Sequence, residues 1–95
     1  MNPVRDQNVM FYTYLLRSKI DGHLYTGSTN DLRKRLKEHN LGKSNYTKKH
    51  VPFEIIYYEA CKSEEDARSR ELYLKSGMGK RYLKNRLSRF LSLTG

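Results

Sequence analysis

A stretch of thirty residues, 11–40, limits most strongly what this chain can fold into. Its first part, 11–17, alternates aromatic, β-branched and aliphatic residues, a pattern typical of a β-strand. Asp21-Gly22 favours a tight turn, so the apolar run at 24–27 should return antiparallel as the second strand of a hairpin. Alternation along the first strand would give one face to the core and leave the other to hold a site.

The hairpin leads into a predicted helix, 31–40, that is rich in cations. Leu32 and Leu36 define its buried stripe, and Arg35 and His39 lie on the two flanks of that stripe, four residues apart. Candidates for its N-cap come directly before it: Ser28, Thr29 and Asn30.

The second half of the chain predicts a strand and then a second helix. Residues 53–59 have the apolar centre of a strand in a central or well-covered position. Ser63 and the acids after it predict the start of the helix. Its apolar stripe should consist of Ala67 and Leu74, with Met78 as a further candidate.

Gly77 and Gly79 should break that helix, and a third helix is predicted from residue 81 to about residue 93. Its apolar residues are spaced i, i+4, i+7 and i+8: Leu83, Leu87, Phe90 and Leu91. The predicted fold class is therefore α+β, a small three-stranded antiparallel sheet flanked by three helices. One domain should span 10–93, behind a flexible arm at 1–9.

The chain carries 19 Lys and Arg against 10 Asp and Glu, a net charge of +9. This surplus indicates a polyanionic partner: nucleic acid is the first candidate and an anionic membrane the second. We expect no membrane partner, because the apolar side chains of the third helix are needed for so small a core. The loop 42–52 mixes cations, hydroxyls and an aromatic ring, which suits phosphate contact and base stacking. Candidate substrate contacts in this loop and at the third helix are Lys43, Tyr46, Lys48, Lys49, Lys80 and Arg81.

Cys61 is the only cysteine, so no internal disulfide can form. A lone cysteine fits a reducing, cytoplasmic setting. No apolar run approaches the roughly 18 residues that a membrane span needs.

Glu71 falls in the middle of the apolar stripe of the second helix. A carboxylate that faces a core costs several kcal/mol unless it has a cation or a metal beside it. Arg35 could supply that cation in a purely structural ion pair, so this position alone does not establish catalysis.

These residue types suit phosphodiester hydrolysis. A carboxylate can hold one Mg²⁺ against the phosphate, and an arginine can stabilise the charge of the transition state. A tyrosine or a histidine can take the proton of the attacking water. Tyrosine is a poor base at its usual pKa of about 10, and His39 is better matched, but the sequence does not decide between them.

Two short motifs, Tyr12-Thr13-Tyr14 and Tyr25-Thr26-Gly27, are followed by Leu-Arg-Lys-Arg-Leu-Lys-Glu-His and later by Arg-Glu-x-Tyr-x-Lys. In combination and spacing they resemble the GIY-YIG nucleases over residues 10–90. The chain looks most like small stand-alone bacterial members, which are similar to the N-terminal nuclease domain of the bacterial excinuclease that acts in DNA excision repair. The resemblance implies a DNA endonuclease that uses Mg²⁺ or Mn²⁺.

The resemblance also implies roles for individual residues. Tyr14 matches a general base or water-orienting group, and Tyr25 the tyrosine of the second motif. Arg35 matches the catalytic arginine, and His39 a member of the proton relay. Glu71 matches the single metal-binding glutamate.

Gly27 closes the second motif and is expected to give the backbone close access to substrate, and Asn85 is a candidate for a late asparagine that lines the site. Three positions depart from the motifs, mainly in packing side chains: Tyr12, Thr13 and Thr26.

A different class of protein remains as an alternative, a catalytically inactive nucleic-acid-binding module that keeps the fold and the basic surface. A binder has no need of a core-facing carboxylate such as Glu71. Because the chain has no room for a separate specificity domain, selectivity would come from the basic loop, the third helix, a homodimer or a protein partner.

Overall fold

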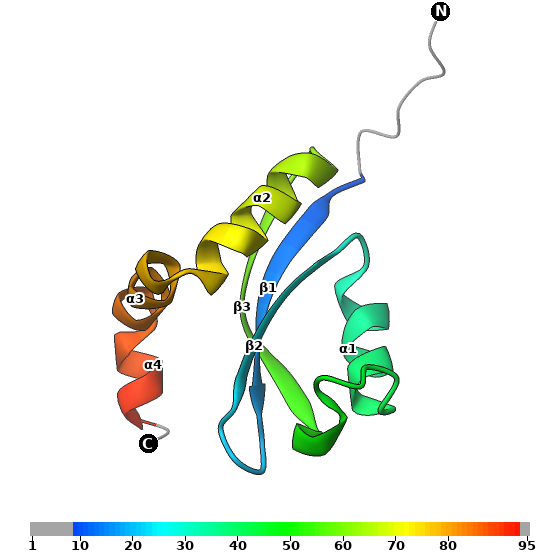
Figure 1. Cartoon of the computed structure of the whole chain (residues 1–95), viewed down its shortest axis with the longest axis vertical. Helices are drawn as coiled ribbons and strands as arrows, with labels where there is room; N and C mark the ends of the chain where they lie inside the picture. Colours follow the sequence, from blue (N-terminus) through cyan, green and yellow to red (C-terminus); the bar gives the residue numbers. More distant parts are fainter. Residues whose placement is uncertain (1–8, 94–95) are drawn as a thin grey trace, which may run out of the picture.

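The computed structural model describes residues 9–93, so nearly all of the arm predicted at 1–9 lies outside the described residues. The elements, in chain order, are β1 (Phe11–Ser18), β2 (Leu24–Thr29), α1 (Leu32–Asn40), the 3₁₀ turn η1 (Lys48–His50), β3 (Phe53–Cys61), α2 (Glu64–Lys75), α3 (Gly77–Arg86) and α4 (Ser88–Leu93). Figure 1 shows α1 on one side of the sheet and α2 to α4 on the other.

The three strands form one antiparallel sheet in the order β2-β1-β3, as predicted. The central strand is β1. The apolar centre of β3 had predicted either a central or a well-covered position, and the second of these is what the structure has. β3 lies at an edge, and its apolar side chains are explained by cover on both faces. Ile55 packs on the α1 side, while Ile56 packs on the other side, next to an irregularity in the β1–β3 register at Leu15/Leu16.

Two apolar clusters hold the layers together. Tyr14, Leu16 and Phe53 are buried beneath α1. Leu15 is buried against Leu74 and Leu83 from α2 and α3. Helices therefore cover both faces of the hairpin, and the catalytic candidate Tyr14 lies on the face that α1 covers, next to His39. Polar side chains gather at the β2 edge, where Glu71 bonds Ser28, and at the β3 edge, where Arg70 pairs with Glu59.

Several helix ends differ from the predicted ones. Asp31 caps α1 by accepting a hydrogen bond from the Lys34 backbone N–H, while Ser28 and Thr29 belong to β2. Ser63 caps α2 as predicted. The break after α2 falls at Ser76, which caps α3, so α3 begins before residue 81.

The two glycines predicted to break the helix lie inside α3. Gly79 is buried where α3 crosses α2, and a side chain there would overlap the backbone of Tyr73 and Leu74. Met78, the further candidate for the apolar stripe, is 70% exposed, because this tight crossing turns it to solvent. The predicted third helix is divided at Leu87 into α3 and α4.

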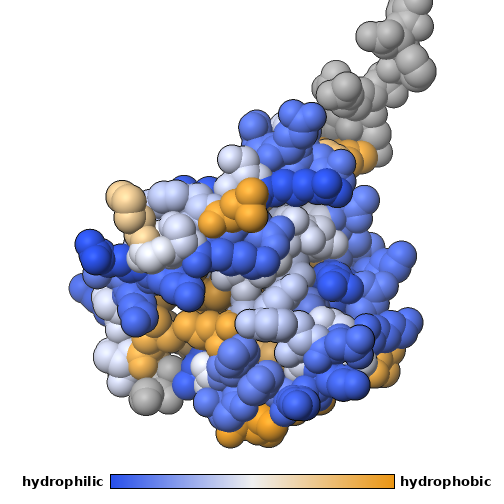
Figure 2. Space-filling model, in the orientation of Figure 1, coloured by the Kyte–Doolittle hydropathy of each residue, from blue (hydrophilic) through white to orange (hydrophobic). Residues whose placement is uncertain are grey.

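The surface matches the high charge of the chain. The face seen in Figure 2 is mostly hydrophilic, with separate apolar patches between the charged side chains. Within residues 9–93, no helix is long and apolar enough to cross a membrane.

Candidate active site

The site is built where Tyr14 of β1 reaches across Gly27 of β2. The two residues are paired in register, and a methyl group at position 27 would lie 2.6 Å from Tyr14 Cζ. Glycine therefore makes room for the phenol, which extends toward the β2 edge. The sequence predicted that Gly27 gives substrate close access to the backbone. In the structure the Tyr14 side chain fills the space beside Gly27.

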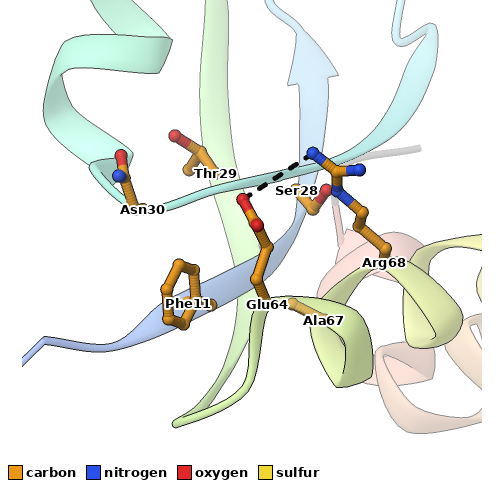
Figure 3. A pocket seen from close by; sticks show the side chains of 7 residues that line it. All are labelled: Phe11, Ser28, Thr29, Asn30, Glu64, Ala67 and Arg68. Atoms are coloured by element: carbon orange, nitrogen blue, oxygen red, sulfur yellow. Dashed lines mark ion pairs between the residues drawn. The ribbon is translucent and has the colours of Figure 1, made fainter. Parts of the chain in front are cut away.

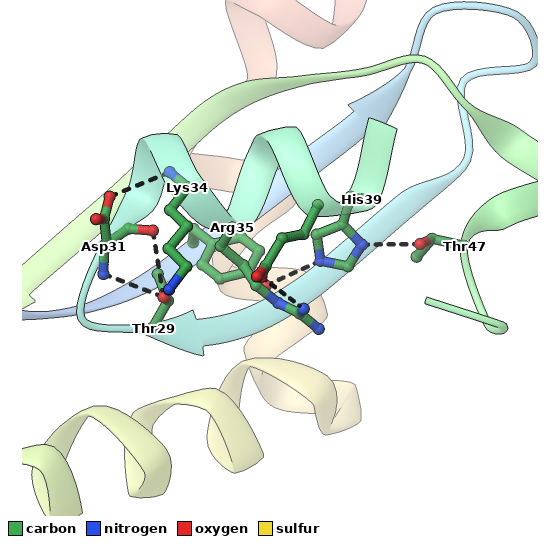
Figure 4. Close-up of polar contacts among 8 residues, drawn as sticks. Thr29, Asp31, Lys34, Arg35, His39 and Thr47 are labelled. Atoms are coloured by element: carbon green, nitrogen blue, oxygen red, sulfur yellow. Dashed lines mark hydrogen bonds and ion pairs between the residues drawn. The ribbon is translucent and has the colours of Figure 1, made fainter. Parts of the chain in front are cut away.

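His39, in the last turn of α1, lies under the sheet and is completely buried. Its Nε2 is 3.1 Å from Tyr14 Oη, and its Nδ1 is 2.8 Å from Thr47 Oγ1. Figure 4 shows Thr47 approaching the ring from the loop while Arg35 lies one turn earlier on α1. Both ring nitrogens thus have partners that also come from buried side chains.

Burial sets the protonation state of this pair. Loss of solvent, with the positive charge of Arg35 as the second cause, lowers the pKa of His39 to about 4. Burial also raises the pKa of Tyr14 to about 12, although the nearby Arg35 guanidinium opposes the rise. At neutral pH the imidazole and the phenol are therefore both uncharged.

Arg35 is one-third exposed at its side chain and forms an ion pair with Glu38 at 3.2 Å. It does not pair with Glu71, the structural partner that the sequence left open. A guanidinium that lies beside Tyr14 and is still exposed can contact an anionic group arriving at this edge.

Glu71 reaches the same edge from α2. Its Oε1 accepts a hydrogen bond from Ser28 Oγ at 2.6 Å, and its Oε2 accepts one from Lys75 Nζ at 2.7 Å. That bond raises the pKa of Lys75. The Lys75 ammonium also lies 5.7 Å from the centre of the Tyr25 ring, so the carboxylate and the second motif share a neighbour.

An open cleft of about 480 Å³ adjoins this group. Its lining residues are Leu24, Tyr25, Thr26, Tyr46, Lys75 and Lys80. Two predicted substrate contacts, Tyr46 and Lys80, thus meet the catalytic candidate Tyr25 at one place. The other predicted contacts are exposed elsewhere and do not line the cleft: Lys43, Lys48, Lys49, Arg81 and Asn85.

The donor set at Glu71 fits a hard divalent cation held by few protein ligands. Among the described residues, no three His, Cys, Asp or Glu side chains are grouped to hold a metal. Mg²⁺ and Mn²⁺ accept one carboxylate together with water and phosphate oxygens, and the Glu71 carboxylate keeps one-fifth of its side chain exposed. Glu71 would hold such an ion, with Ser28 fixing the carboxylate.

Three supporting residues were not identified from the sequence: Ser28, Thr47 and Lys75. Ser28 and Glu71 are 43 positions apart, and Thr47 sits in an irregular loop, so no local pattern indicates either contact. Lys75 had a usable signal, because an i, i+4 spacing from Glu71 predicts an ion pair on one helix face.

Comparison with known proteins identifies the family. A family model described as the GIY-YIG catalytic domain matches residues 10–91. The chain is 45% identical over 67 residues to the UPF0213 protein CPE1444 of Clostridium perfringens, covering 70% of this chain and 71% of that protein. It is 46% identical over 65 residues to the UPF0213 protein SpyM3_1077 of Streptococcus pyogenes serotype M3, covering 67% and 70%.

A solved structure is also similar, the solution NMR structure of the UPF0213 protein BH0048 from Bacillus halodurans. It has 37% sequence identity and a TM-score of 0.49, and the match covers 80% of this chain and 83% of that one. The chain belongs to the GIY-YIG family, which confirms the predicted resemblance and fold class. Membership implies a nuclease-type function that acts on nucleic acid.

Proposed function

We propose that this protein is a divalent-metal-dependent endonuclease that hydrolyses phosphodiester bonds in DNA. The observation that carries the proposal is the convergence at the β2 edge: Tyr14 bonded to a neutral His39, Arg35 beside them, and Glu71 arriving from the opposite layer. The net charge of +9 is consistent with a DNA backbone as the ligand.

Tyr14 and His39 form a proton relay in this proposal. When Nδ1 of His39 donates its proton to Thr47 Oγ1, Nε2 is left as an acceptor for the Tyr14 hydroxyl. The Tyr14 oxygen can then take a proton from water while its own proton moves to His39. A neutral phenol is a weak base by itself, and His39, with a pKa of about 4, is a weaker proton acceptor than a free histidine, so the pair would mainly orient the attacking water and pass its proton on as the new bond forms.

Arg35 and Glu71 handle charge on the phosphate side. The planar guanidinium of Arg35 would bind phosphate oxygens as their negative charge grows in the transition state. Glu71 would hold the metal, which when bound supplies Lewis-acid stabilisation of the phosphate. Tyr25, whose ring centre is 5.0 Å from that of His39, closes the wall of the site toward the cleft.

The test compares the wild type with Glu71→Gln on supercoiled plasmid and on an oligonucleotide duplex, in Mg²⁺, in Mn²⁺ and in EDTA. Glutamine keeps the side-chain shape and an acceptor for Ser28 but removes the charge, so cleavage should be lost while DNA binding, measured by fluorescence anisotropy, stays close to the wild-type value. Glu65→Gln, an exposed carboxylate on the same helix, is the matched control and should cut normally. Binding without any metal-dependent cut by the wild type would favour the inactive DNA-binding module instead.

A further inference from the structure

Lys75 forms an ion pair with the Glu71 carboxylate, which is the group that holds the metal in the proposed function. Lys75 Nζ is 2.7 Å from Glu71 Oε2, while Ser28 takes the other oxygen. An ammonium at that distance neutralises the carboxylate and covers one of its oxygens. A divalent cation arriving at Oε2 would meet both the blocked oxygen and the repulsion of the positive charge.

A second ion pair on the same helix shows what an ordinary surface pair looks like here. Glu64 and Arg68 have the same i, i+4 spacing, but their shortest distance is 3.7 Å and their side chains are 60% and 71% exposed. Both residues line a small pocket, and Figure 3 shows the dashed line that joins them, with no other charged side chain among the residues drawn. The Lys75–Glu71 pair is shorter and more buried, with exposures of 45% and 20%.

The Lys75 side chain has an open cleft beside it into which it can move. Its side chain lines the cleft, and the ammonium lies 5.7 Å from the centre of the Tyr25 ring. Tyr46 and Lys80 line the same cleft. The ammonium can therefore leave Oε2 without being buried in an apolar environment, which keeps the exchange with a metal reversible.

We propose that Lys75 is a positioning residue that competes with the divalent cation for Glu71. In the metal-free protein it holds the carboxylate in place, and it lowers the affinity for metal until it is displaced into the cleft. This inference rests on the proposed function, because it takes Glu71 as the metal ligand.

The experiment is a titration with Mn²⁺ alone, without DNA, in which free Mn²⁺ is measured by electron paramagnetic resonance. Lys75→Met keeps the aliphatic chain beside Tyr25 and removes the charge, so Mn²⁺ should bind roughly tenfold more tightly than to the wild type, the size expected for removing one nearby unit charge at a partly exposed site. Arg68→Met, which removes the equivalent cation from the ordinary pair, should leave the affinity unchanged. Lys75→Arg restores a cation and should return the affinity close to the wild-type value, which a purely structural role would not require.

Glu71→Gln separates the two hypotheses. If wild type and Glu71→Gln bind Mn²⁺ equally, Glu71 is not the metal ligand and the proposed function fails with it. If Glu71→Gln loses Mn²⁺ but Lys75→Met binds it no more tightly than the wild type, the competition alone is refuted. Circular dichroism of each variant, with Lys75→Gln as a second neutral substitution, ensures that the comparison is made between folded proteins.

Discussion

Protonation of His39 should destabilise this protein by a measurable amount as the pH falls. The ring is completely buried, and its pKa is about 4 in the folded chain against 6.5 for an unperturbed histidine. The unfolded chain therefore binds more protons than the folded chain between these two values, and the free energy of unfolding rises with pH across that window. Stability from this source is complete above pH 6.5 and is lost as the pH falls toward 4.

The size of the effect follows from the same two values. At about 1.4 kcal/mol for each pH unit of pKa difference, the neutral His39 contributes up to about 3 kcal/mol to the free energy of unfolding at pH 7. That is a large share of the roughly 5–15 kcal/mol typical of a small domain.

The assay is urea unfolding followed by far-ultraviolet circular dichroism at pH steps between 7.5 and 4. His39→Gln should start less stable, and the difference between it and the wild type should shrink as the pH falls, because only the wild type has this buried base to protonate. Asn45→Gln, an exposed substitution that involves no ionisable group, is the control and should retain the wild-type pH dependence in this window. Parallel curves for the wild type and His39→Gln would refute the assignment of a neutral, desolvated His39.

Two further substitutions test the site directly. Arg35→Ala should lower kcat by about two to three orders of magnitude, the usual cost of losing a transition-state charge partner, while Arg33→Ala, on the exposed face of the same helix, should not; a change confined to KM would make Arg35 a binding residue. Gly27→Ala forces a methyl group against the buried Tyr14 phenol and should cost about 1–3 kcal/mol in thermal or urea unfolding, with slower cleavage. Gly77→Ala, where nothing lies within 4 Å of the added atom, is its control, and equal stability of the two alanine variants would contradict the close approach of Tyr14 and Gly27.

The order and type of the elements could be predicted because their signals are local. Alternation in β1, the Asp21-Gly22 turn and the Ser63 cap each act over a few residues, and all appear in the structure. The ends of α3 could not be predicted in the same way. Glycine favours a break by its intrinsic propensity, but Gly79 is kept inside the helix by its close contact with α2, which only the tertiary structure reveals.

The sequence indicated which residues are candidates for the site, but it did not indicate which side chains bond to them. Glu71 is a carboxylate on the apolar stripe of one helix, and His39 lies beside the apolar stripe of another helix. Both positions are unusual enough to notice in a sequence. Thr47 and Ser28 are ordinary residues whose importance comes from long-range contacts with His39 and Glu71. The sequence also placed Arg35 as a possible partner of Glu71, and the i, i+4 geometry of a single helix instead favours Lys75 over an arginine from the opposite layer.

The arrangement of the layers gives a physical reason to prefer an enzyme over an inactive binding module. The Tyr14–His39–Thr47 chain is buried beneath α1, where none of its rings can contact a DNA backbone in a binding role. Each of these three polar side chains has a hydrogen-bond partner within the group, which offsets the free-energy cost of burying it. The Tyr14 phenol, which is only 2% exposed, lies against Gly27 of β2, the strand whose Ser28 bonds Glu71 from the other layer. This arrangement favours the proposed nuclease over a module that only binds, and the cleavage assay with Glu71→Gln decides between the two.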